Sequence, residues 1–205
     1  MYFTNRTEAA IQLLPLVKKY RGPNTVVLAI PRGGVPIGCI LANSLEAPLD
    51  LLMSKKIGAP YDPEYAIGAV GIKGELIEET LGIPEEYIRQ EIVKIKQQLQ
   101  ERYRNFWGDR QPLSLQDKTV LITDDGIATG RTILAAIPML KKQAPKSIIV
   151  AVPVCSVQAR ERLLPVVDEL ISCYYPDPFI GVGRFYTNFG QVEDEEVITL
   201  LQPFR

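Results

Sequence analysis

The segment of residues 120–132, VLITDDGIATGRT, holds the densest group of side chains that could bind a ligand. An apolar run delivers two adjacent carboxylates, Asp124 and Asp125, into a loop of small residues that opens a helix. Small residues let backbone N–H groups converge, threonine hydroxyls add donors, and the helix N-terminus adds the positive end of its dipole, which together predict a phosphate-binding loop. The residues that would form this loop are Gly126, Ala128, Thr129, Gly130 and Thr132.

The acidic pair requires a different partner, because two carboxylates beside a phosphate repel it unless they face hydroxyl groups or a cation. Asp124 and Asp125 therefore indicate a ribose diol, a magnesium ion, or both. The plain alternative is a turn followed by a capped helix start, which would not need a second Asp. The segment does not match the P-loop pattern, because three residues instead of four separate Gly126 from Gly130, and Arg131 stands where Lys is required.

A second candidate loop, Pro31, Arg32, Gly33 and Gly34, also follows an apolar run, residues 26–30. Taken alone, it could be a glycine turn with a surface arginine. Two loops of this kind, each placed directly after a buried-type strand, indicate one shared ligand site beyond the carboxyl ends of the strands.

The two loops, in this order, resemble the pyrophosphate loop and the phosphoribosyl-pyrophosphate (PRPP) motif of the type I phosphoribosyltransferases. The resemblance spans about residues 26–173. Thr123 departs where the family pattern has an apolar residue, and Gly126 departs where it usually has a larger aliphatic one. These departures indicate a divergent or unassigned branch of the family.

The resemblance implies roles for individual residues. Asp124 and Asp125 would hold the ribose 2- and 3-hydroxyls and contact Mg²⁺ indirectly, through those hydroxyls or water. Arg32 would stabilise the leaving pyrophosphate on a loop that in the family often contains a cis peptide bond before a non-proline residue. Lys56 would assist, although Lys55 and Lys56 could equally be a solvated pair. The implied catalytic residues are Arg32, Asp124 and Asp125, and the implied PRPP-binding residues are Arg32, Gly33, Gly34, Lys56, Asp124, Asp125, Gly126, Ala128, Thr129, Gly130, Arg131 and Thr132.

The implied activity is transfer of the 5-phosphoribosyl group from PRPP to a nitrogenous base, purine or pyrimidine, with release of pyrophosphate and with Mg²⁺ as cofactor. Two alternatives stay open: a regulator that binds PRPP without turnover, and a P-loop-like or other phosphate-ester enzyme. The chain contains no histidine, which excludes Ser-His-Asp and Cys-His catalysis and HExxH zinc sites. Phosphoribosyl transfer needs no covalent nucleophile and is compatible with that absence.

Alternating strands and helices must position these loops, and they predict an α/β fold with a mainly parallel twisted sheet flanked by helices, a Rossmann-like core. We expect one domain, residues 1–205, with a core over about 24–173, a helical insertion at about 73–118 in the place of the family's flap, and a variable C-terminal hood over about 174–205. The predicted strands are residues 26–30, 49–54, 66–72, 75–78, 119–123, 147–154 and 169–173, and the predicted helices are 35–45, 84–106, 133–142, 157–164 and 192–201, after a first helix capped by Thr4.

Two features have competing interpretations. Apolar residues step by three or four along residues 84–106, which predicts a packing stripe, or otherwise a lid or dimer contact. The aromatic residues of the tail, 174–190, could stack on a base or simply pack in the core. The resemblance together with the long helix leads us to expect a homodimer.

Charge, hydropathy and cysteine spacing argue against several other classes of protein. With 23 Lys+Arg against 24 Asp+Glu, the net charge of -1 argues against a nucleic-acid-binding protein. No apolar run is long enough for a membrane span, and no signal peptide is apparent, so we expect no membrane partner and a cytoplasmic location. The cysteines, Cys39, Cys155 and Cys173, lack metal-site spacing and are expected to be buried apolar residues.

Overall fold

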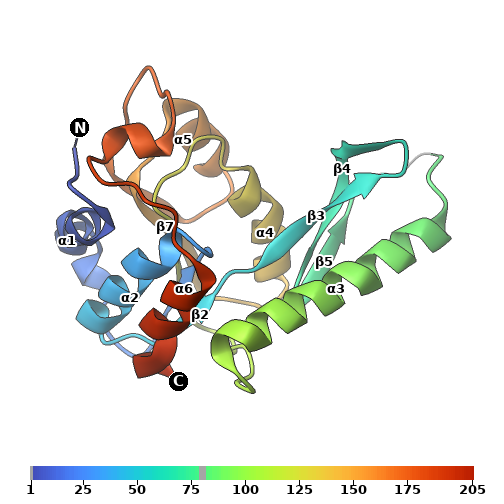
Figure 1. The fold of residues 1–205 in the computed structure, drawn as a ribbon, viewed down its shortest axis with the longest axis horizontal. Helices are drawn as coiled ribbons and strands as arrows, with labels where there is room; N and C mark the ends of the chain where they lie inside the picture. Colours follow the sequence, from blue (N-terminus) through green and yellow to red (C-terminus); the bar gives the residue numbers. More distant parts are fainter. Residues whose placement is uncertain (1, 79–81) are drawn as a thin grey trace.

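A computed structural model describes residues 2–78 and 82–205 and contains a five-stranded parallel sheet of order β2-β1-β6-β7-β8. Figure 1 shows the sheet within the larger body of the molecule. The three central strands, β1, β6 and β7, carry apolar runs and are almost entirely buried, as strands covered on both faces require. The sheet confirms the predicted α/β class, and its strands are β1 (Thr25–Ala29), β2 (Leu49–Leu51), β6 (Thr119–Thr123), β7 (Ser147–Val154) and β8 (Glu169–Tyr174).

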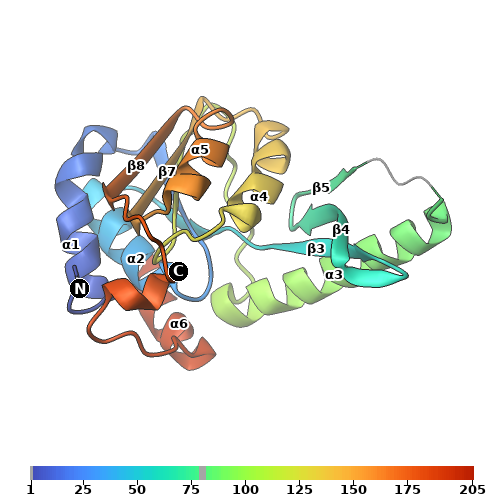
Figure 2. The same cartoon turned by 90° about the horizontal axis from the view of Figure 1, so that it is seen from above.

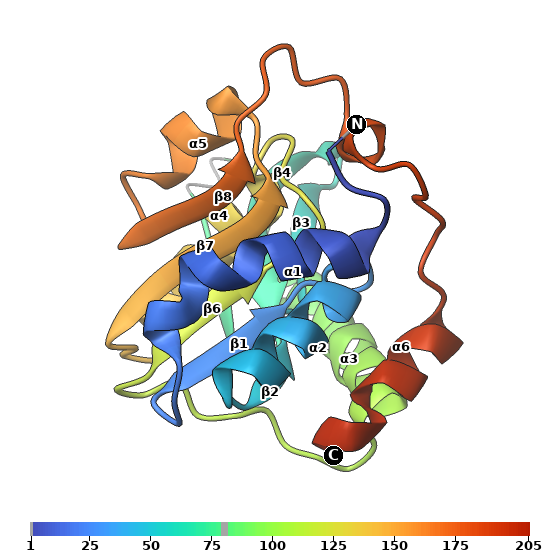
Figure 3. The same cartoon turned by 90° about the vertical axis from the view of Figure 1, so that its left-hand side faces the viewer.

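Helices cover both faces of this sheet. On one face lie α1 (Arg6–Val17) and α2 (Gly34–Leu45), which pack on alternate strand residues such as Val27 and Leu121. On the other lie α4 (Arg131–Lys141) and α5 (Val157–Leu163), which pack on the intervening residues such as Leu28 and Ile122. Figure 3 shows α1 and α2 in front of the strands, with α5 behind. The period-2 alternation of the strands thus divides the core between two helical layers.

A second, antiparallel sheet of three strands projects from the body and is backed by one long helix (Figures 1 and 2). We name this unit the arm; it consists of β3 (Ser54–Ala59), β4 (Asp62–Gly71), β5 (Gly74–Ile77) and α3 (Glu85–Trp107). The apolar stripe of α3, including Ile95, Leu99 and Phe106, is buried in the core cluster that contains Ile57 and Val70 of the arm sheet. The packing interpretation of the stripe is therefore confirmed. The predicted insertion at 73–118 includes residues 79–81, which lie outside the described residues.

The sequence prediction was wrong about where one strand ends. A single strand was expected over residues 49–54, followed by a loop that carries Lys55 and Lys56. Instead β2 ends at Leu51, and both lysines lie within β3, paired with Val70 and Ala69 of β4. The cause is that the first halves of β3 and β4 are exposed and mostly polar, so these strands lack the continuous apolar pattern of the core strands.

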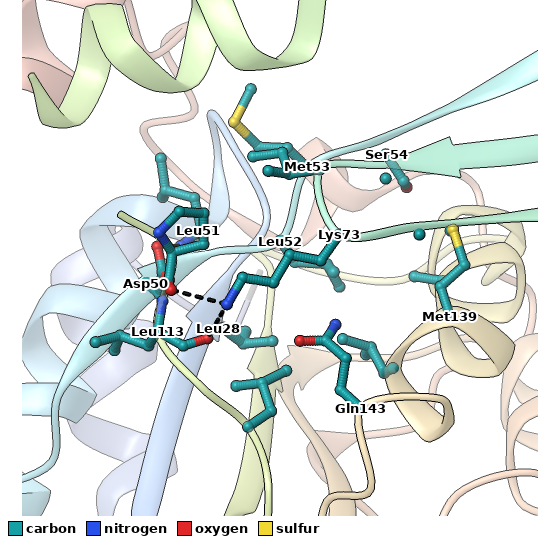
Figure 4. A pocket seen from close by; sticks show the side chains of 17 residues that line it. Leu28, Asp50, Leu51, Leu52, Met53, Ser54, Lys73, Leu113, Met139 and Gln143 are labelled. Atoms are coloured by element: carbon teal, nitrogen blue, oxygen red, sulfur yellow. Dashed lines mark hydrogen bonds between the residues drawn. The ribbon is translucent and has the colours of Figure 1, made fainter. Parts of the chain in front are cut away.

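The arm joins the body at a small cavity of about 60 Å³, shown in Figure 4. There Lys73 Nζ donates to the backbone oxygens of Pro112 and Leu113, both at 2.8 Å. Asp50, only 3% exposed, accepts hydrogen bonds from Leu113 N at 2.7 Å and from the Tyr103 hydroxyl at 2.8 Å. These polar contacts fix the end of α3 and the following segment against β2.

The N-terminal segment and the tail pack on each other. Tyr2 stacks on Tyr174 with ring centroids 4.3 Å apart, and Phe3 lies 5.2 Å from Tyr186. Phe179 and Phe185 also pair, at 5.0 Å. These tail aromatics therefore pack against other side chains of the protein, as the packing interpretation predicts.

The tail continues through short 3-10 turns at Val182–Phe185 and Gln202–Phe204 and the helix α6 (Asp194–Leu201). The N-cap of the first helix lies one residue later than expected: the side chain of Asn5, and not that of Thr4, accepts a hydrogen bond from Glu8 N at 3.0 Å. Cys39 and Cys155 are buried as expected, while Cys173 is partly exposed. Within the two described ranges, none of the helices is long and apolar enough to cross a membrane.

A pair of buried threonines provides a test of the core. The Thr123 hydroxyl is buried without a hydrogen-bond partner, whereas the Thr25 hydroxyl donates to Tyr20 O at 2.6 Å. Thr123→Val should raise the free energy of unfolding by about 1 kcal/mol, because it removes an unsatisfied hydroxyl at nearly constant shape. Thr25→Val, its control, should lower that free energy by a similar amount. Urea titration measures both, and a Thr123→Val variant that is less stable than wild type would contradict the assignment.

Candidate functional site

The candidate site lies where the connections of two adjacent parallel strands, β1 and β6, lead to opposite faces of the sheet. Strand β1 is followed by α2 on one face and pairs next with β2, whereas β6, its other neighbour, is followed by α4 on the opposite face. Loops that diverge from adjacent parallel strands leave a crevice between them, where α/β proteins bind ligands. The two loops at this point are the β1–α2 loop, residues 30–33, and the β6–α4 loop, residues 124–130.

Glycines allow these loops to touch. A Cβ atom on Gly33 would lie 2.1 Å from Asp125 Oδ2, and one on Gly34 would lie 2.7 Å from the backbone oxygen of Thr123. Neither distance is possible for a real side chain, so only glycine permits this approach. The Pro31–Arg32 peptide bond is cis, a feature that the resemblance to the family's pyrophosphate loop led us to expect.

The acidic pair is partly buried at the start of the β6–α4 loop. Asp124 Oδ1 accepts a hydrogen bond from Asp125 N at 2.8 Å. Burial, together with the neighbouring Asp125 charge, raises the pKa of Asp124 to about 8. Burial also raises the pKa of Asp125, while hydrogen bonds and charge from Arg6 act in the opposite direction. Burial thus favours the protonated form of Asp124.

The rest of the β6–α4 loop borders a cavity of about 170 Å³. The loop is anchored to the end of β7: Ile127 N donates to Val154 O at 2.9 Å, and the Ser156 hydroxyl donates to Ala128 O at 2.6 Å. The same Ser156 oxygen caps α5 by accepting from Ala159 N. The cavity brings together Asp124 and the predicted phosphate-binding residues Gly126, Ala128, Thr129, Gly130, Arg131 and Thr132.

The structure explains why residue 126 is a glycine in this chain. A Cβ atom there would lie 2.7 Å from Val182 of the tail and 2.8 Å from Val154. The space that a larger aliphatic residue would occupy is therefore filled by the tail, which explains this departure from the family pattern.

Two predicted residues lie apart from the acidic pair. Arg32 Nη1 is 3.2 Å from Glu193 Oε2 and 3.3 Å from Asp194 Oδ1, so its guanidinium is paired with the tail. Lys56 Nζ donates to Glu64 Oε2 at 2.8 Å, and this lysine lines a different groove, between the arm and α4, which it shares with Arg131 and Thr132. Neither side chain lines the cavity of the β6–α4 loop.

The sequence analysis missed three residues that hold the site together. Ser156 supports the β6–α4 loop, the Tyr186 hydroxyl donates to Asp125 O at 2.6 Å, and Arg6 binds the Asp125 carboxylate. Arg6 does carry a signal in the sequence, since a cation in the first turn of a helix opposes the helix dipole and needs another reason to be there. Nothing in the sequence pairs Tyr186 or Ser156 with a residue so distant along the chain.

The close approach of the loops can be tested at Gly33. Gly33→Ala should destabilise the fold by about 1–3 kcal/mol, because the new methyl group overlaps the Asp125 carboxylate. Gly190→Ala is the control, since a Cβ there meets nothing within 4 Å. Thermal and chemical denaturation compare the two variants, and equal stabilities would contradict the described contact.

The raised pKa of Asp124 predicts a pH dependence of stability. Native Asp124 retains a proton that the unfolded chain loses near pH 4, so the free energy of unfolding should fall as the pH rises from about 4 to about 8. The slope is at most about 1.4 kcal/mol per pH unit for one proton. Asp124→Asn should flatten this slope, whereas Asp177→Asn in the exposed tail should keep it. Denaturation curves across the pH range decide, and parallel curves for wild type and Asp124→Asn would refute the assignment.

Comparison with known proteins agrees with this geometry. The family model described as "Phosphoribosyl transferase domain" matches residues 7–183. The chain is 35% identical over 204 residues to Rv0571c of Mycobacterium tuberculosis (strain ATCC 25618 / H37Rv), a provisionally named phosphoribosyl transferase; the match covers 97% of this chain and 46% of that protein. The chain thus spans about half the length of this curated relative.

Solved structures show the same fold. The crystal structure of TT1426 from Thermus thermophilus has a TM-score of 0.88 at 32% identity, covering 100% of this chain and 99% of that one. A hypoxanthine phosphoribosyltransferase from Staphylococcus aureus shares the fold with a TM-score of 0.50 at 14% identity, covering 87% of this chain and 79% of that one. On its sequence, its sheet and its paired loops, the chain belongs to the type I phosphoribosyltransferase family.

Proposed function

We propose that this protein transfers the 5-phosphoribosyl group from PRPP to a nitrogenous base and releases pyrophosphate. The observation that carries the proposal is the contact between the β1–α2 loop and the acidic pair at the divergence of β1 and β6. In this proposal, the loop that would bind pyrophosphate, the acidic pair that would bind the diol and the loop that would bind the 5-phosphate meet at one crevice. PRPP carries these three groups in one molecule, and that correspondence supports it as the substrate.

The proposed chemistry needs no nucleophilic side chain. Backbone N–H groups and the hydroxyls of Thr129 and Thr132 would bind the 5-phosphate at the start of α4. Asp124 and Asp125 would accept hydrogen bonds from the ribose hydroxyls. The amides of Gly33 and Gly34 would stabilise the departing pyrophosphate, and the closed site would shield the cationic sugar from water.

Arg32 would have to exchange partners in this reaction. Its guanidinium now lies beside Glu193 and Asp194, and a pyrophosphate of higher charge would compete with these carboxylates for it. The side chains of Glu193 and Asp194 are 59% and 50% exposed, so the existing pairs are weak. Lys56, paired with the exposed Glu64 on the arm, would join only if the arm approaches the crevice.

The donor set fits Mg²⁺ held mainly by substrate. Among the described residues no three His, Cys, Asp or Glu side chains group into a metal site. Asp124 and Asp125 would therefore contact the ion through ribose hydroxyls or water, which suits the preference of Mg²⁺ for a largely hydrated shell. When bound, the ion would supply neutralisation of the pyrophosphate charge.

The first test is calorimetric titration of the protein with PRPP, with and without Mg²⁺. We expect binding in the micromolar range that depends on Mg²⁺. The double variant Asp124→Asn, Asp125→Asn should fold, as judged by circular dichroism, and lose this binding, because it can no longer offer two carboxylates to the diol. Asp177→Asn is the control and should bind like wild type. Unchanged affinity in the folded double variant would refute the site.

Turnover then separates a transferase from a regulator. Purine and pyrimidine bases are supplied with PRPP and Mg²⁺, and released pyrophosphate is measured. Binding without release for any base would favour the PRPP-binding regulator, and a preference for nucleoside triphosphate over PRPP would favour another phosphate-ester enzyme.

A further inference from the structure

The N-terminal segment and the tail form one hydrogen-bonded unit beside the candidate site. The N–H groups of Tyr2 and Phe3 both lie 3.0 Å from Phe185 O. In return, Thr187 N donates to Phe3 O at 2.8 Å and Asn188 N donates to Thr4 O at 2.8 Å. Segments from opposite ends of the chain therefore depend on each other for their position.

Arg6 extends from this unit to the acidic pair. Its Nη2 and Nε atoms donate to Asp125 Oδ2 at 2.7 and 3.0 Å, and its Nη1 atom donates to Gly190 O at 2.8 Å. Its guanidinium carbon lies 4.1 Å from the centre of the Phe189 ring. All three nitrogens and one face of the guanidinium are thus engaged, and the side chains of Arg6 and Asp125 are each only 13% exposed.

These contacts fix one carboxylate oxygen and leave the other. Asp125 Oδ2 lies against Gly33 and accepts both bonds from Arg6, while the backbone oxygen of Asp125 is held by Tyr186. Because Arg6 holds Oδ2 with two hydrogen bonds and Gly33 lies against the same oxygen, the carboxylate cannot rotate freely, and the direction of Oδ1 is fixed with it. A buried carboxylate that loses its only cationic partner, in contrast, is strongly destabilised and turns toward other donors.

The geometry points to Arg6 as a positioning residue of the PRPP site: it binds Asp125 through Oδ2, so that Oδ1 is aimed at a ribose hydroxyl. This inference rests on the proposed function. It adds the N-terminal segment and the tail to the site, and Arg6, Phe189 and Gly190 all lie outside the residues 7–183 that the family model matches. Arg6 acts through Asp125, to which it donates two of its three hydrogen bonds; the third goes to Gly190 O.

Two variants and one control test the role of Arg6. Arg6→Met removes the charge and the fork, Arg6→Lys keeps a charge but only one donor position, and Arg184→Met removes an exposed arginine of the same tail. Each protein is titrated with PRPP and Mg²⁺, and separately with inorganic pyrophosphate and Mg²⁺, which lacks the ribose. Circular dichroism measures folding under the same conditions.

We expect Arg6→Met to weaken PRPP binding at least about tenfold and Arg6→Lys to give an intermediate loss, since truncation of a buried charged pair is costly. Pyrophosphate binding should stay unchanged in both, because that ligand lacks the ribose hydroxyls to which Asp125 would bond, and Arg184→Met should match wild type. A purely structural role would instead weaken both ligands in parallel.

Each contrary outcome has a distinct meaning. Wild-type affinity for PRPP in Arg6→Met, or an equal loss for pyrophosphate, overturns the positioning role and leaves the proposed function standing. Should Arg6→Met not fold, wild-type affinity for PRPP in Arg6→Lys overturns the role in the same way. Failure of wild type itself to bind PRPP refutes the proposed function, and the role of Arg6 with it.

Discussion

The rest of the site depends on how closely two backbones approach each other at the ends of β1 and β6. The strands pair in register to their last residues, and Ile30 N still donates to Thr123 O at 2.9 Å. Beyond this bond the chains diverge to opposite faces, but Gly33 still lies against Asp125, and Gly34 lies against Thr123 and Asp124. The crevice, the burial of the acidic pair and the position of the β6–α4 loop all follow from this constraint.

Charge is balanced locally within this crowded region. Three basic residues near the loops each face carboxylates: Arg6 faces Asp125, Arg32 faces Glu193 and Asp194, and Lys56 faces Glu64. Only the first of these pairs is largely buried, so its loss would carry the largest desolvation penalty. The exposed pairs are weak and can be exchanged for a ligand of higher charge. The chain is nearly neutral, with a net charge of -1, and each of these three basic residues is paired with a carboxylate.

Much of the fold and of the site could be predicted from the sequence because both depend on local patterns. The buried strand of residues 119–123 has three consecutive apolar residues, Val120 to Ile122, and the loop after that strand carries its donors close together in sequence. The missed features all depend on distant contacts. Arg6 meets Asp125 across 119 residues, and Tyr186 meets it across 61. The strand β3 was missed for a related reason, since its pairing with β4, and not its own composition, defines it.

Asp50 helps to anchor the base of the arm to the body. This buried carboxylate binds Tyr103 near one end of α3 and Leu113 just beyond it, so the base of the helix is fixed to the edge of the parallel sheet. A helix of 23 residues is about 34 Å long. By simple trigonometry, a tilt of about 5° at Asp50 would move the far end of such a rod by about 3 Å. The arm therefore amplifies small displacements at its base, and the placement of its distal residues depends on the contacts that Asp50, Lys73 and Arg110 make there.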